Sequence, residues 1–496
     1  MKYDVVIIGS GLGGLQCAYI LSKEGYRVCL IEKNPQLGGC LQTFKRDGSI
    51  FDTGMHYIGS MDEGQMLEKY FRYFGLSGKL KLRKLDESGY DVVRYGGKEY
   101  KFAMGYERFV ETLVKEFPKE REALDKYVAK IREVSNSVDL YNMRDFKGVN
   151  TSYFEFFGNG IDSFINSITS NTTLRSVLLG TLSLYAGVKD RTPLYIPLII
   201  HSSYIESAYR FVDGGSQISD LLAQYIVENG GTILKKSEVT KFIFSNHKLD
   251  AVEINHSEHI EGKMFISNIH PKKMLEMMDT HLLKPAYRHR IHDLEDTSGI
   301  FSLYVVLKKK SFKYLNQNYY HFDTQNVWEG ENYTDANWPR GYMMHISPDA
   351  NDEEYADNII MNTYMKWDDV KAWENTTVEK RGDDYKAMKQ RKAEKLISVL
   401  ERDFPGVSKC IKSYYSSTPL TYRDYTGTNK GSIYGILKDY SNPLKSMILP
   451  KTKVPNLLLT GQNINIHGVV GVTICSVLTC AELLGMGYLV KKIRNA

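Results

Sequence analysis

Three glycines and one acidic residue near the start of the chain have the spacing of a dinucleotide site. Gly9, Gly11 and Gly14 fit the pattern G-x-G-x-x-G, and Glu32 follows them. A glycine-rich turn lets the backbone approach a pyrophosphate, and a carboxylate can accept hydrogen bonds from the hydroxyls of a ribose. The negative charge of Glu32 would also repel a 2′-phosphate. These residue types therefore favour the binding of a dinucleotide without that phosphate.

The surrounding sequence predicts the elements that position these residues. Residues 5–8 (VVII) are all β-branched, which is typical of a strand buried on both faces of a parallel sheet. A helical repeat of apolar residues follows the glycines, Gly25 ends it, and residues 28–31 form a second apolar strand before Glu32. The start of the helix would offer free N–H groups to the pyrophosphate. The alternative is a glycine-rich turn without a ligand, but the complete order of elements favours the dinucleotide.

Two further glycine-rich segments could reach the same ligand. Gly38 and Gly39 lie six and seven residues beyond Glu32. Near the other end of the chain, an apolar strand over 457–459 is followed by a turn at Gly461 and by a glycine-rich stretch that opens an apolar helix. If one dinucleotide contacts both ends of the chain, its domain is assembled from discontinuous segments.

The composition is that of a globular protein with more than one domain. The chain has 496 residues, of which 42% are hydrophobic and 25% charged, and its formal net charge is +5. This length favours two or three domains, and the mild charge gives no sign of nucleic-acid binding. The six cysteines form no C-x-x-C pair, which favours a reducing compartment. With no signal peptide and no apolar run of spanning length evident, the sequence predicts a cytoplasmic protein.

The rest of the chain predicts further elements of both domains. Residues from about 106 to 145 have the apolar spacing of amphipathic helices, and Asp47–Gly48 is typical of a hairpin turn. A helix is expected from about Ser216 to Glu228, and strands of a mixed sheet over 300–350. The segment DDYKAMKQRKAEKLISVLERDFPG predicts another amphipathic helix with a solvated charged face.

Five further motifs point to one family. They are FDTGMHYIG from Phe51 to Gly59, FPKE from Phe117 to Glu120, SNIHP from Ser267 to Pro271, TPLTYRDYTG from Thr418 to Gly427, and LLTGQNINIHGVVGV from Leu458 to Val472. With the first motif, they resemble the FAD-dependent phytoene desaturase, carotenoid isomerase and retinol saturase family, within the wider amine-oxidase-like flavoproteins. The resemblance covers essentially the full length and implies FAD rather than NAD.

The resemblance implies an α/β fold with two domains. A Rossmann-like FAD-binding domain, a parallel sheet with helices, would be assembled from the discontinuous segments 1–65, 210–298 and 440–496. A mixed α+β substrate-binding domain with a helical insertion would comprise residues 66–209 and 299–439.

The resemblance also implies which residues contact FAD. At the pyrophosphate, it implies Gly9, Ser10, Gly11, Leu12, Gly13 and Gly14. The adenosine ribose would contact Glu32 and Lys33, the adenine would contact Val239, and the cofactor would run along Gly38 and Gly39. The ribityl–phosphate region would lie near Gly461 and Gln462, and the flavin near Gly471 and Val472. Many relatives have an acid where this chain has the neutral Gln462, so we expect no charge-based contact there. No histidine or cysteine has a spacing that demands a covalent flavin bond, although Cys475 is close, so the FAD is expected to be non-covalent.

The flavin N5 atom can itself give or take a hydride, so the reaction needs few catalytic groups from the protein. The sequence shows no triad, no paired carboxylates and no metal-ligand cluster. The resemblance brings His56, Tyr57 and His467 near the flavin, where each could deliver a proton or orient a polyene. A purely structural role is the alternative for each of them.

The function that the resemblance implies is the saturation, desaturation or isomerisation of a carbon–carbon double bond in a carotenoid- or retinoid-like isoprenoid. The alternatives are an FAD-dependent amine oxidase and a non-catalytic flavin-binding redox protein. The expected partners are the apolar isoprenoid, an unknown electron donor or acceptor and, transiently, the surface of a membrane, on which the cytoplasmic protein would be peripheral. The apolar stretch from Tyr195 to Tyr209 would be the membrane patch or the tunnel behind it; protein core is the alternative.

Overall fold

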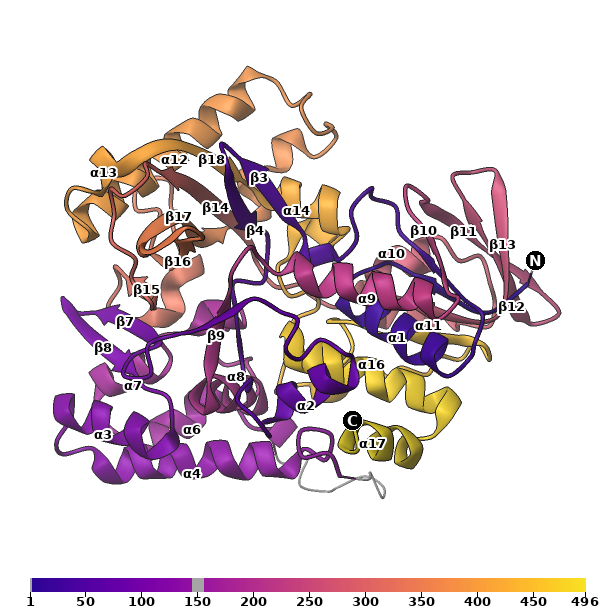
Figure 1. The fold of residues 1–496 in the computed structure, drawn as a ribbon, viewed down its shortest axis with the longest axis horizontal. Coiled ribbons are helices and arrows are strands. Elements are labelled where there is room, and N and C mark those ends of the chain that lie inside the picture. Colours follow the sequence, from indigo (N-terminus) through magenta and orange to yellow (C-terminus); the bar gives the residue numbers. More distant parts are fainter. Residues whose placement is uncertain (1, 145–155) are drawn as a thin grey trace.

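Two large β-sheets organise the computed structural model, which describes residues 2–144 and 156–496 (Figure 1). The first sheet contains β1 (Tyr3–Ile8), β2 (Val28–Ile31), β10 (Thr232–Leu234), β11 (Val239–Ser245), β12 (Lys248–Ile254), β13 (Glu258–Ser267) and β19 (Leu457–Leu459). Strands β10, β2, β1, β13 and β19 are parallel, and β12 and β11 extend the sheet in antiparallel fashion. Val5 and Ile7 belong to one core and Val6 and Ile8 to another, because both faces of the sheet are covered.

The helices beside this sheet come from distant parts of the chain. They are α1 (Leu12–Lys23), α9 (Ser216–Glu228), α10 (Pro271–Glu276), α11 (Pro285–His292), α16 (Gly468–Leu484) and α17 (Met486–Arg494). Helix α1 contacts both α9 and α16, so the indigo and yellow ends of the chain lie side by side (Figure 1). Gln16 links them inside the core, since its amide donates to Thr473 Oγ1 at 2.8 Å and accepts from Ser476 Oγ at 3.0 Å.

The second sheet is mixed. Its strands, in spatial order, are β18 (Ile411–Ser417), β14 (Gly299–Leu307), β17 (Asp352–Met365), β16 (Gly341–Asp349), β15 (Asn318–Phe322), β7 (Asp91–Tyr95) and β8 (Lys98–Phe102). All neighbours are antiparallel except β15 and β7. The long helix α12 (Asp383–Asp403), orange in Figure 1, packs against this sheet with its buried Tyr385, Met388, Leu396 and Leu400.

Smaller elements complete the second half of the molecule. The helices are α2 (Met66–Tyr73), α3 (Tyr106–Glu116), α4 (Arg121–Ser137), α6 (Ile161–Ile168), α7 (Thr172–Leu178), α8 (Tyr195–Glu206), α13 (Val407–Cys410), α14 (Pro419–Thr426) and α15 (Pro443–Ser446). The strands are β3 (Thr43–Arg46) paired with β4 (Ser49–Asp52), and β9 (Ala208–Phe211) between β5 (Tyr57–Gly59) and β6 (Leu82–Lys84). None of the helices in 2–144 and 156–496 combines the length and the apolar character that crossing a bilayer requires.

The predicted fold class is confirmed, with a Rossmann-like parallel sheet and a second, mixed sheet. The helix expected over 216–228 is α9, and the predicted turn at Asp47–Gly48 joins β3 to β4. The pattern over 106–145 forms two helices, of which the second ends at Ser137; residue 145 lies outside the described residues. The domain boundaries stay a prediction.

The expectation of an exposed membrane patch in α8 is wrong. Ile196, Leu198 and Ile199 are 4%, 0% and 5% exposed, because α8 packs against α4 and β5. A helix that is apolar all round is typical of the interior of a protein. Ile199 and the neighbouring Ile200 line an internal cavity instead.

Candidate functional site

One cavity of about 340 Å³ lies where the two halves of the molecule meet, a size typical of small-molecule sites. Ile8, Ile31, Asn268 and Gly461 line it, and they stand at or just beyond the carboxyl ends of β1, β2, β13 and β19. Ligands of open parallel sheets bind at this edge of the strands. The rest of the lining comes from α8, from α14 and the loops around it, and from the second sheet.

Two helices begin at this cavity without a side chain that caps them. Helix α1 follows Gly11 and α16 follows His467, and neither residue accepts a side-chain hydrogen bond from its helix. Gly13 of α1 and Gly468 of α16 both line the cavity. The free N–H groups and the positive dipole ends of two helices therefore serve the same space, which suits a pyrophosphate.

Glu32 is held in place at the end of β2. Its Oε2 accepts hydrogen bonds from the backbone N–H of Ser10 at 3.0 Å and from the Ser10 hydroxyl at 2.6 Å, and its Oε1 accepts from the N–H of Asn34 at 2.8 Å. The carboxylate has about four acceptor positions, so lone-pair capacity remains for a ribose hydroxyl. Glu32 lines the cavity although it is only 6% exposed.

The glycine doublet returns to the first loop, as the sequence led us to expect. Gly38 forms a backbone bridge with Gly11. The N–H of Gly38 also donates to the carbonyl of Ser10 at 3.1 Å and to its hydroxyl at 3.2 Å. Ser10 thus joins the doublet to Glu32.

Asn268, which sequence reasoning missed, packs between the first and last glycine-rich loops. Its Nδ2 donates to the Gly9 carbonyl at 3.3 Å. A Cβ added at Gly11 would lie 2.8 Å from this Nδ2, and Cβ atoms at Gly13 and Gly461 would press on the Oδ1 of the same side chain. Glycine is needed at these positions because Asn268 already fills the space. The sequence did contain a signal for this residue, because Asn268 belongs to the motif SNIHP, but no role was predicted for its side-chain amide.

The predicted cofactor residues gather around the cavity, with one exception. Its lining includes Gly9, Ser10, Gly11, Leu12, Gly13, Glu32, Lys33, Gly38, Gly39, Val239, Gly461, Gln462, Gly471 and Val472. Gly14 is absent from the lining, and a Cβ there would collide with the Gly9 carbonyl oxygen. Gly14 therefore serves the close packing of α1 on β1. Which atoms of a cofactor each residue touches stays a prediction.

The half of the cavity away from the first sheet has an apolar wall and aromatic neighbours. Leu184, Ile199 and Ile200 face the second sheet, which contributes Ile300 and Met343. Of the described residues, Glu32 and Glu238 are the only acids in the whole lining, and both belong to the dinucleotide half. This end of the cavity therefore suits a long uncharged ligand.

The three proton candidates all line the cavity, but their surroundings differ. The Tyr57 hydroxyl is occupied, since it donates to Asp91 Oδ2 at 3.0 Å and lies 2.6 Å from the Tyr320 hydroxyl. His467 stacks on Tyr434 at 4.1 Å, and its Nε2 has no hydrogen-bond partner in the described chain. Burial, with the nearby Lys438, lowers the pKa of His467 to about 3.

His56 belongs to a group that we call the histidine cluster, made of His56, Asp91, Arg210, Asn318, His345 and Asn362. The rings of His56 and His345 stack at 4.3 Å and 17°. His345 Nδ1 lies 2.9 Å from Asn318 Oδ1, and Asn362 Nδ2 lies 3.2 Å from His56 Nε2. Within the described residues, His56 Nδ1, His345 Nε2 and Asn362 Oδ1 are buried and have no hydrogen-bond partner.

Burial dominates the electrostatics of the histidine cluster. It lowers the pKa of His56 to about 3, and with His56 and Arg210 it holds the pKa of His345 well below the ordinary 6.5. It raises the pKa of Asp91 to about 7. Both imidazoles are therefore neutral near pH 7. Sequence reasoning missed His345 and Asn362, because each occupies one position in an apolar strand and only the sheet brings them together.

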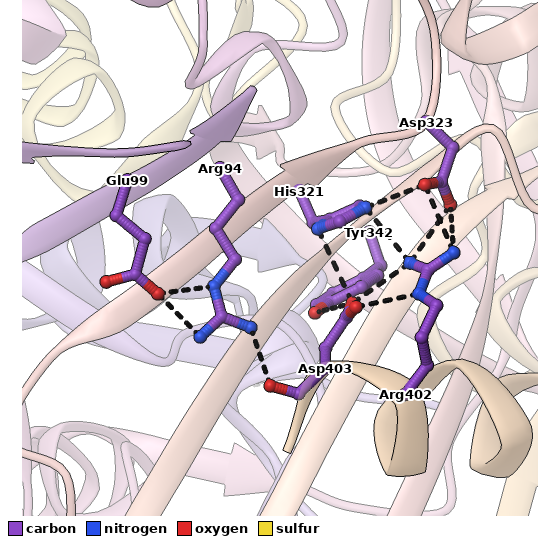
Figure 2. A network of polar contacts seen from close by, with 7 residues as sticks. All are labelled: Arg94, Glu99, His321, Asp323, Tyr342, Arg402 and Asp403. Carbon is purple, nitrogen blue, oxygen red and sulfur yellow. Dashed lines mark hydrogen bonds and ion pairs between the residues drawn. The ribbon is translucent and has the colours of Figure 1, made fainter. Parts of the chain in front are cut away.

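A second polar group lies at the same sheet and contains two arginines and three carboxylates. We call it the charged network: Arg94, Glu99, His321, Asp323, Tyr342, Arg402 and Asp403 (Figure 2). His321 Nε2 is 2.8 Å from Asp323 Oδ1 and its Nδ1 is 3.4 Å from Asp403 Oδ2. The Tyr342 hydroxyl donates to Asp403 at 2.7 Å, and Arg402 Nε lies 2.8 Å from the same carboxylate. His321 and Tyr342 also line the cavity.

Comparison with known proteins shows which family the chain resembles. Residues 7–74 match the model of an NAD(P)-binding Rossmann-like domain. The chain is 26% identical to the human all-trans-retinol 13,14-reductase, over 100% of this chain and 87% of that protein, and 23% identical to prolycopene isomerase 2 of an Oncidium hybrid cultivar, over 93% and 80%. Over nearly its full length, the chain is similar to members of the phytoene desaturase, carotenoid isomerase and retinol saturase family.

The structural comparison places the chain in the same fold as amine oxidases. The cyclohexylamine oxidase of Brevibacterium oxydans superposes with a TM-score of 0.63 over 98% of this chain and 100% of that chain, at 13% identity. The chain is an oxidoreductase, like its relatives in sequence, and its likeness to the amine oxidases shows a shared fold. The uncapped helix starts, the glycine loops and Glu32 fit an FAD-type dinucleotide.

Proposed function

We propose that the protein holds one FAD non-covalently and uses it to change a carbon–carbon double bond of a carotenoid- or retinoid-like isoprenoid. The observation that carries the proposal is the single cavity that runs from the glycine loops to the apolar wall of α8 without an acid in that half. When bound, FAD supplies hydride transfer at N5. The protein would hold the pyrophosphate at the start of α1, the ribose at Glu32 and the flavin near the start of α16, and would shield the reacting carbons from water.

The non-covalent mode is supported by the position of the cysteines. Cys475 is fully buried and is not part of the cavity lining. Cys40 lines the cavity, but burial raises the pKa of its thiol to about 11, so it stays protonated and is a poor nucleophile. Acid precipitation of the yellow protein should therefore release the flavin into the supernatant. Colour retained in the pellet would contradict non-covalent binding.

Two variants test the cofactor residues. Gly11→Val should abolish FAD binding, because its side chain would displace Asn268 and enter the loop that receives the pyrophosphate. Glu32→Ala should weaken binding by roughly tenfold to a hundredfold, since charged hydrogen bonds contribute about 1.5–3 kcal/mol. Flavin content and the FAD dissociation constant give the answer. Equal flavin content in wild type and both variants would show that this loop is not the site.

The substrate class is tested with the flavin as reporter. Oxidised and chemically reduced holoprotein are each mixed without oxygen with phytoene, prolycopene and all-trans-retinol in detergent micelles, and flavin absorbance is followed. A polyene that changes the redox state of the flavin, with a product that differs by two hydrogens, supports the proposal. An isomerised product with unchanged flavin supports the isomerase form. No reaction with any polyene contradicts the proposal.

An amine oxidase is the second candidate, because the fold is shared and Tyr364 and Tyr434 both line the cavity. A protonated amine would find no carboxylate in the substrate half of the lining, which counts against this function. Hydrogen peroxide formed from putrescine or cyclohexylamine in air would support it. A polyene-dependent redox change without peroxide from amines separates the two functions.

A transient contact with membranes remains part of the proposal, at a different place from α8. Leu444 and Leu449 are 65% and 59% exposed, and Lys445 and Lys451 are their neighbours in the chain. Exposed leucines beside lysines suit the surface of an anionic bilayer. Leu444→Ser with Leu449→Ser should reduce flotation with anionic liposomes while the melting temperature stays constant. Undiminished flotation would exclude this segment as the contact.

A further inference from the structure

The side-chain amide of Asn318 has one possible orientation, because Arg210 beside it can only donate. Arg210 Nη2, which can only donate, lies 2.6 Å from Asn318 Oδ1. Asn318 Nδ2 lies 2.8 Å from Asp91 Oδ1, which accepts. The reverse orientation would set donor against donor and acceptor against acceptor. Asn318 Oδ1 is therefore an acceptor toward every group that it meets.

This orientation fixes the tautomer of His345. His345 Nδ1 lies 2.9 Å from the same Oδ1, so Nδ1 carries the hydrogen and donates it. In a neutral imidazole the other nitrogen, Nε2, then has a lone pair and no hydrogen. Burial together with His56 and Arg210 keeps the pKa of the ring well below 6.5, which agrees with a neutral ring.

The lone pair of His345 is held ready for a ligand. The residue is 2% exposed, and Nε2 has no hydrogen-bond partner among the described residues. His345 lines the cavity whereas Asn318, its partner at Nδ1, does not. A buried acceptor without a partner is uncommon in proteins and is typical of sites where a ligand supplies the partner.

We propose that His345 is the catalytic residue that exchanges a proton with the substrate, with Asn318 and Asp91 as the positioning residues that hold its tautomer. The proposal rests on the proposed function. In dehydrogenation, bound oxidised FAD would supply the acceptor for the hydride that leaves one C–H bond of the substrate. The neighbouring carbon loses a proton to His345 Nε2, and the electron pair of that C–H bond forms the double bond.

Because the His345 ring is neutral, its Nε2 acts as a proton acceptor in this step. His56, stacked on His345, is not an equivalent base. With the Asn362 amide donating to His56 Nε2, the free Nδ1 of His56 carries hydrogen and is a donor. The two rings thus carry a buried lone pair and a buried N–H group without partners among the described residues, and both residues line the cavity.

The kinetic test uses His345→Asn in the holoprotein. The new amide nitrogen can still donate to Asn318, but the group that accepts the proton is gone. The rate of flavin reduction or reoxidation by the reactive polyene should fall by roughly 10²–10⁴-fold, with unchanged flavin content. A rate within about tenfold of wild type would overturn the proposal, since a general base contributes more than that.

His201→Asn is the matched control. His201 is also 2% exposed, and burial lowers its pKa to about 4, but it lies outside the cavity lining. Both of its nitrogens have partners, Tyr127 at 2.6 Å and Thr181 at 2.7 Å. This variant should lose stability and keep the rate. A comparable loss of rate in both variants would mean that any buried histidine has this effect, which would also overturn the proposal.

A second measurement needs no substrate. Nitrogen-15 NMR of histidine-labelled holoprotein, with the His345 signal assigned from its disappearance in His345→Asn, should show hydrogen on Nδ1 and none on Nε2. Hydrogen on Nε2 would overturn the proposal. If no polyene reacts with wild type, the proposed function fails and the proton exchange fails with it. If wild type and His345→Asn react equally, the role of His345 alone is refuted.

Discussion

Two histidines on neighbouring strands of the second sheet line the same cavity and have opposite surroundings. His321 on β15 lies between the carboxylates of Asp323 and Asp403 in the charged network (Figure 2). His345 on β16 faces Asn318 on one side, stacks on His56, and has Arg210 rather than a carboxylate beside it. Both rings stack on another ring, His321 on Tyr342 at 5.1 Å and His345 on His56 at 4.3 Å.

The difference teaches that partners, not residue type, decide what a buried imidazole can do. In the charged network, every carboxylate meets a cation or a hydroxyl, and the contacts join α12 to three strands of the sheet. Among the described residues, three polar atoms of the histidine cluster are buried without a hydrogen-bond partner, and the charged network has one such atom, His321 Nδ1, which lies 3.4 Å from Asp403 Oδ2. A nearly complete set of contacts stabilises a fold, whereas a less complete set leaves capacity for a ligand at a cost in stability.

The largest expected effect is on the free energy of unfolding. The same change, histidine to asparagine, is made once in each of the two groups. His321→Asn should lower it by about 1–3 kcal/mol, because Asp323 and Asp403 each lose a partner in a partly buried place. His345→Asn should change it by less than about 1 kcal/mol, since an atom without a partner is removed. Urea denaturation gives both values. Equal losses would erase the distinction between the two groups.

The pH dependence of stability should sharpen the comparison. The pKa of His345 is lowered in the folded protein, so below 6.5 the unfolded chain takes up a proton that the folded ring does not. Wild type should therefore lose stability relative to His345→Asn as pH falls below 6.5, by up to about 1.4 kcal/mol per pH unit. His56, Tyr57 and Arg210 lie beside the ring, and Asp91 lies behind Asn318, in both proteins, so their effects largely cancel from the difference.

The charged network provides the contrasting control for this pH series. Burial alone would raise the pKa of Asp403, but Arg402, Tyr342 and His321 hold it below the ordinary 3.8. Its contribution is fully present above 3.8 and is lost only as pH falls through the lowered value. Melting temperatures of wild type and Asp403→Asn should therefore run parallel from pH 7 to pH 5. If the melting temperatures of wild type and His345→Asn also ran parallel from pH 7 to pH 5, the conclusion that the His345 ring is neutral would be refuted.

The smallest expected effect concerns salt. Arg402 is 48% exposed, so added salt screens its pairs with Asp323 and Asp403. The stability difference between wild type and Asp323→Asn should shrink by about 0.5 kcal/mol or less between low salt and about 1 M salt. The difference for His345→Asn should not change, because its cluster is neutral at the ring and buried. A salt effect of the same size for Asp323→Asn and His345→Asn would contradict the distinction between the charged network and the histidine cluster.

The dinucleotide half was predictable because its signals are local in the chain. The order of strand, glycines, helix and acid from Val5 to Glu32 is contained in one stretch, and each part has one physical purpose. The apolar period of α12 and the turn at Asp47–Gly48 were predictable for the same reason. The reason why position 11 needs glycine was not predictable, because it depends on Asn268, more than 250 residues away in the chain.

The histidine cluster could not be predicted from local pattern. His345 and Asn362 lie on the paired strands β16 and β17, whose register follows from the whole sheet. Asn318 and Asp91 are joined by the parallel pairing of β15 and β7, across an interval of 227 residues. The α8 segment failed for a related reason: its apolar residues are equally consistent with a buried helix and a surface patch, and only packing distinguishes them.

The meeting of the two chain ends has a consequence for biosynthesis. A ribosome makes Gly9 to Glu32 first, yet the loop at Gly461 and the helix α16 that pack against this segment are made last. At ordinary rates of translation, this interval is on the order of a minute. Throughout that time α1 lacks α16, and for about the first half of it β1 also lacks β13, so their apolar faces are uncovered. Cofactor capture is thus the closing event of synthesis, and a nascent chain cut short before Gly461 has no completed place for it.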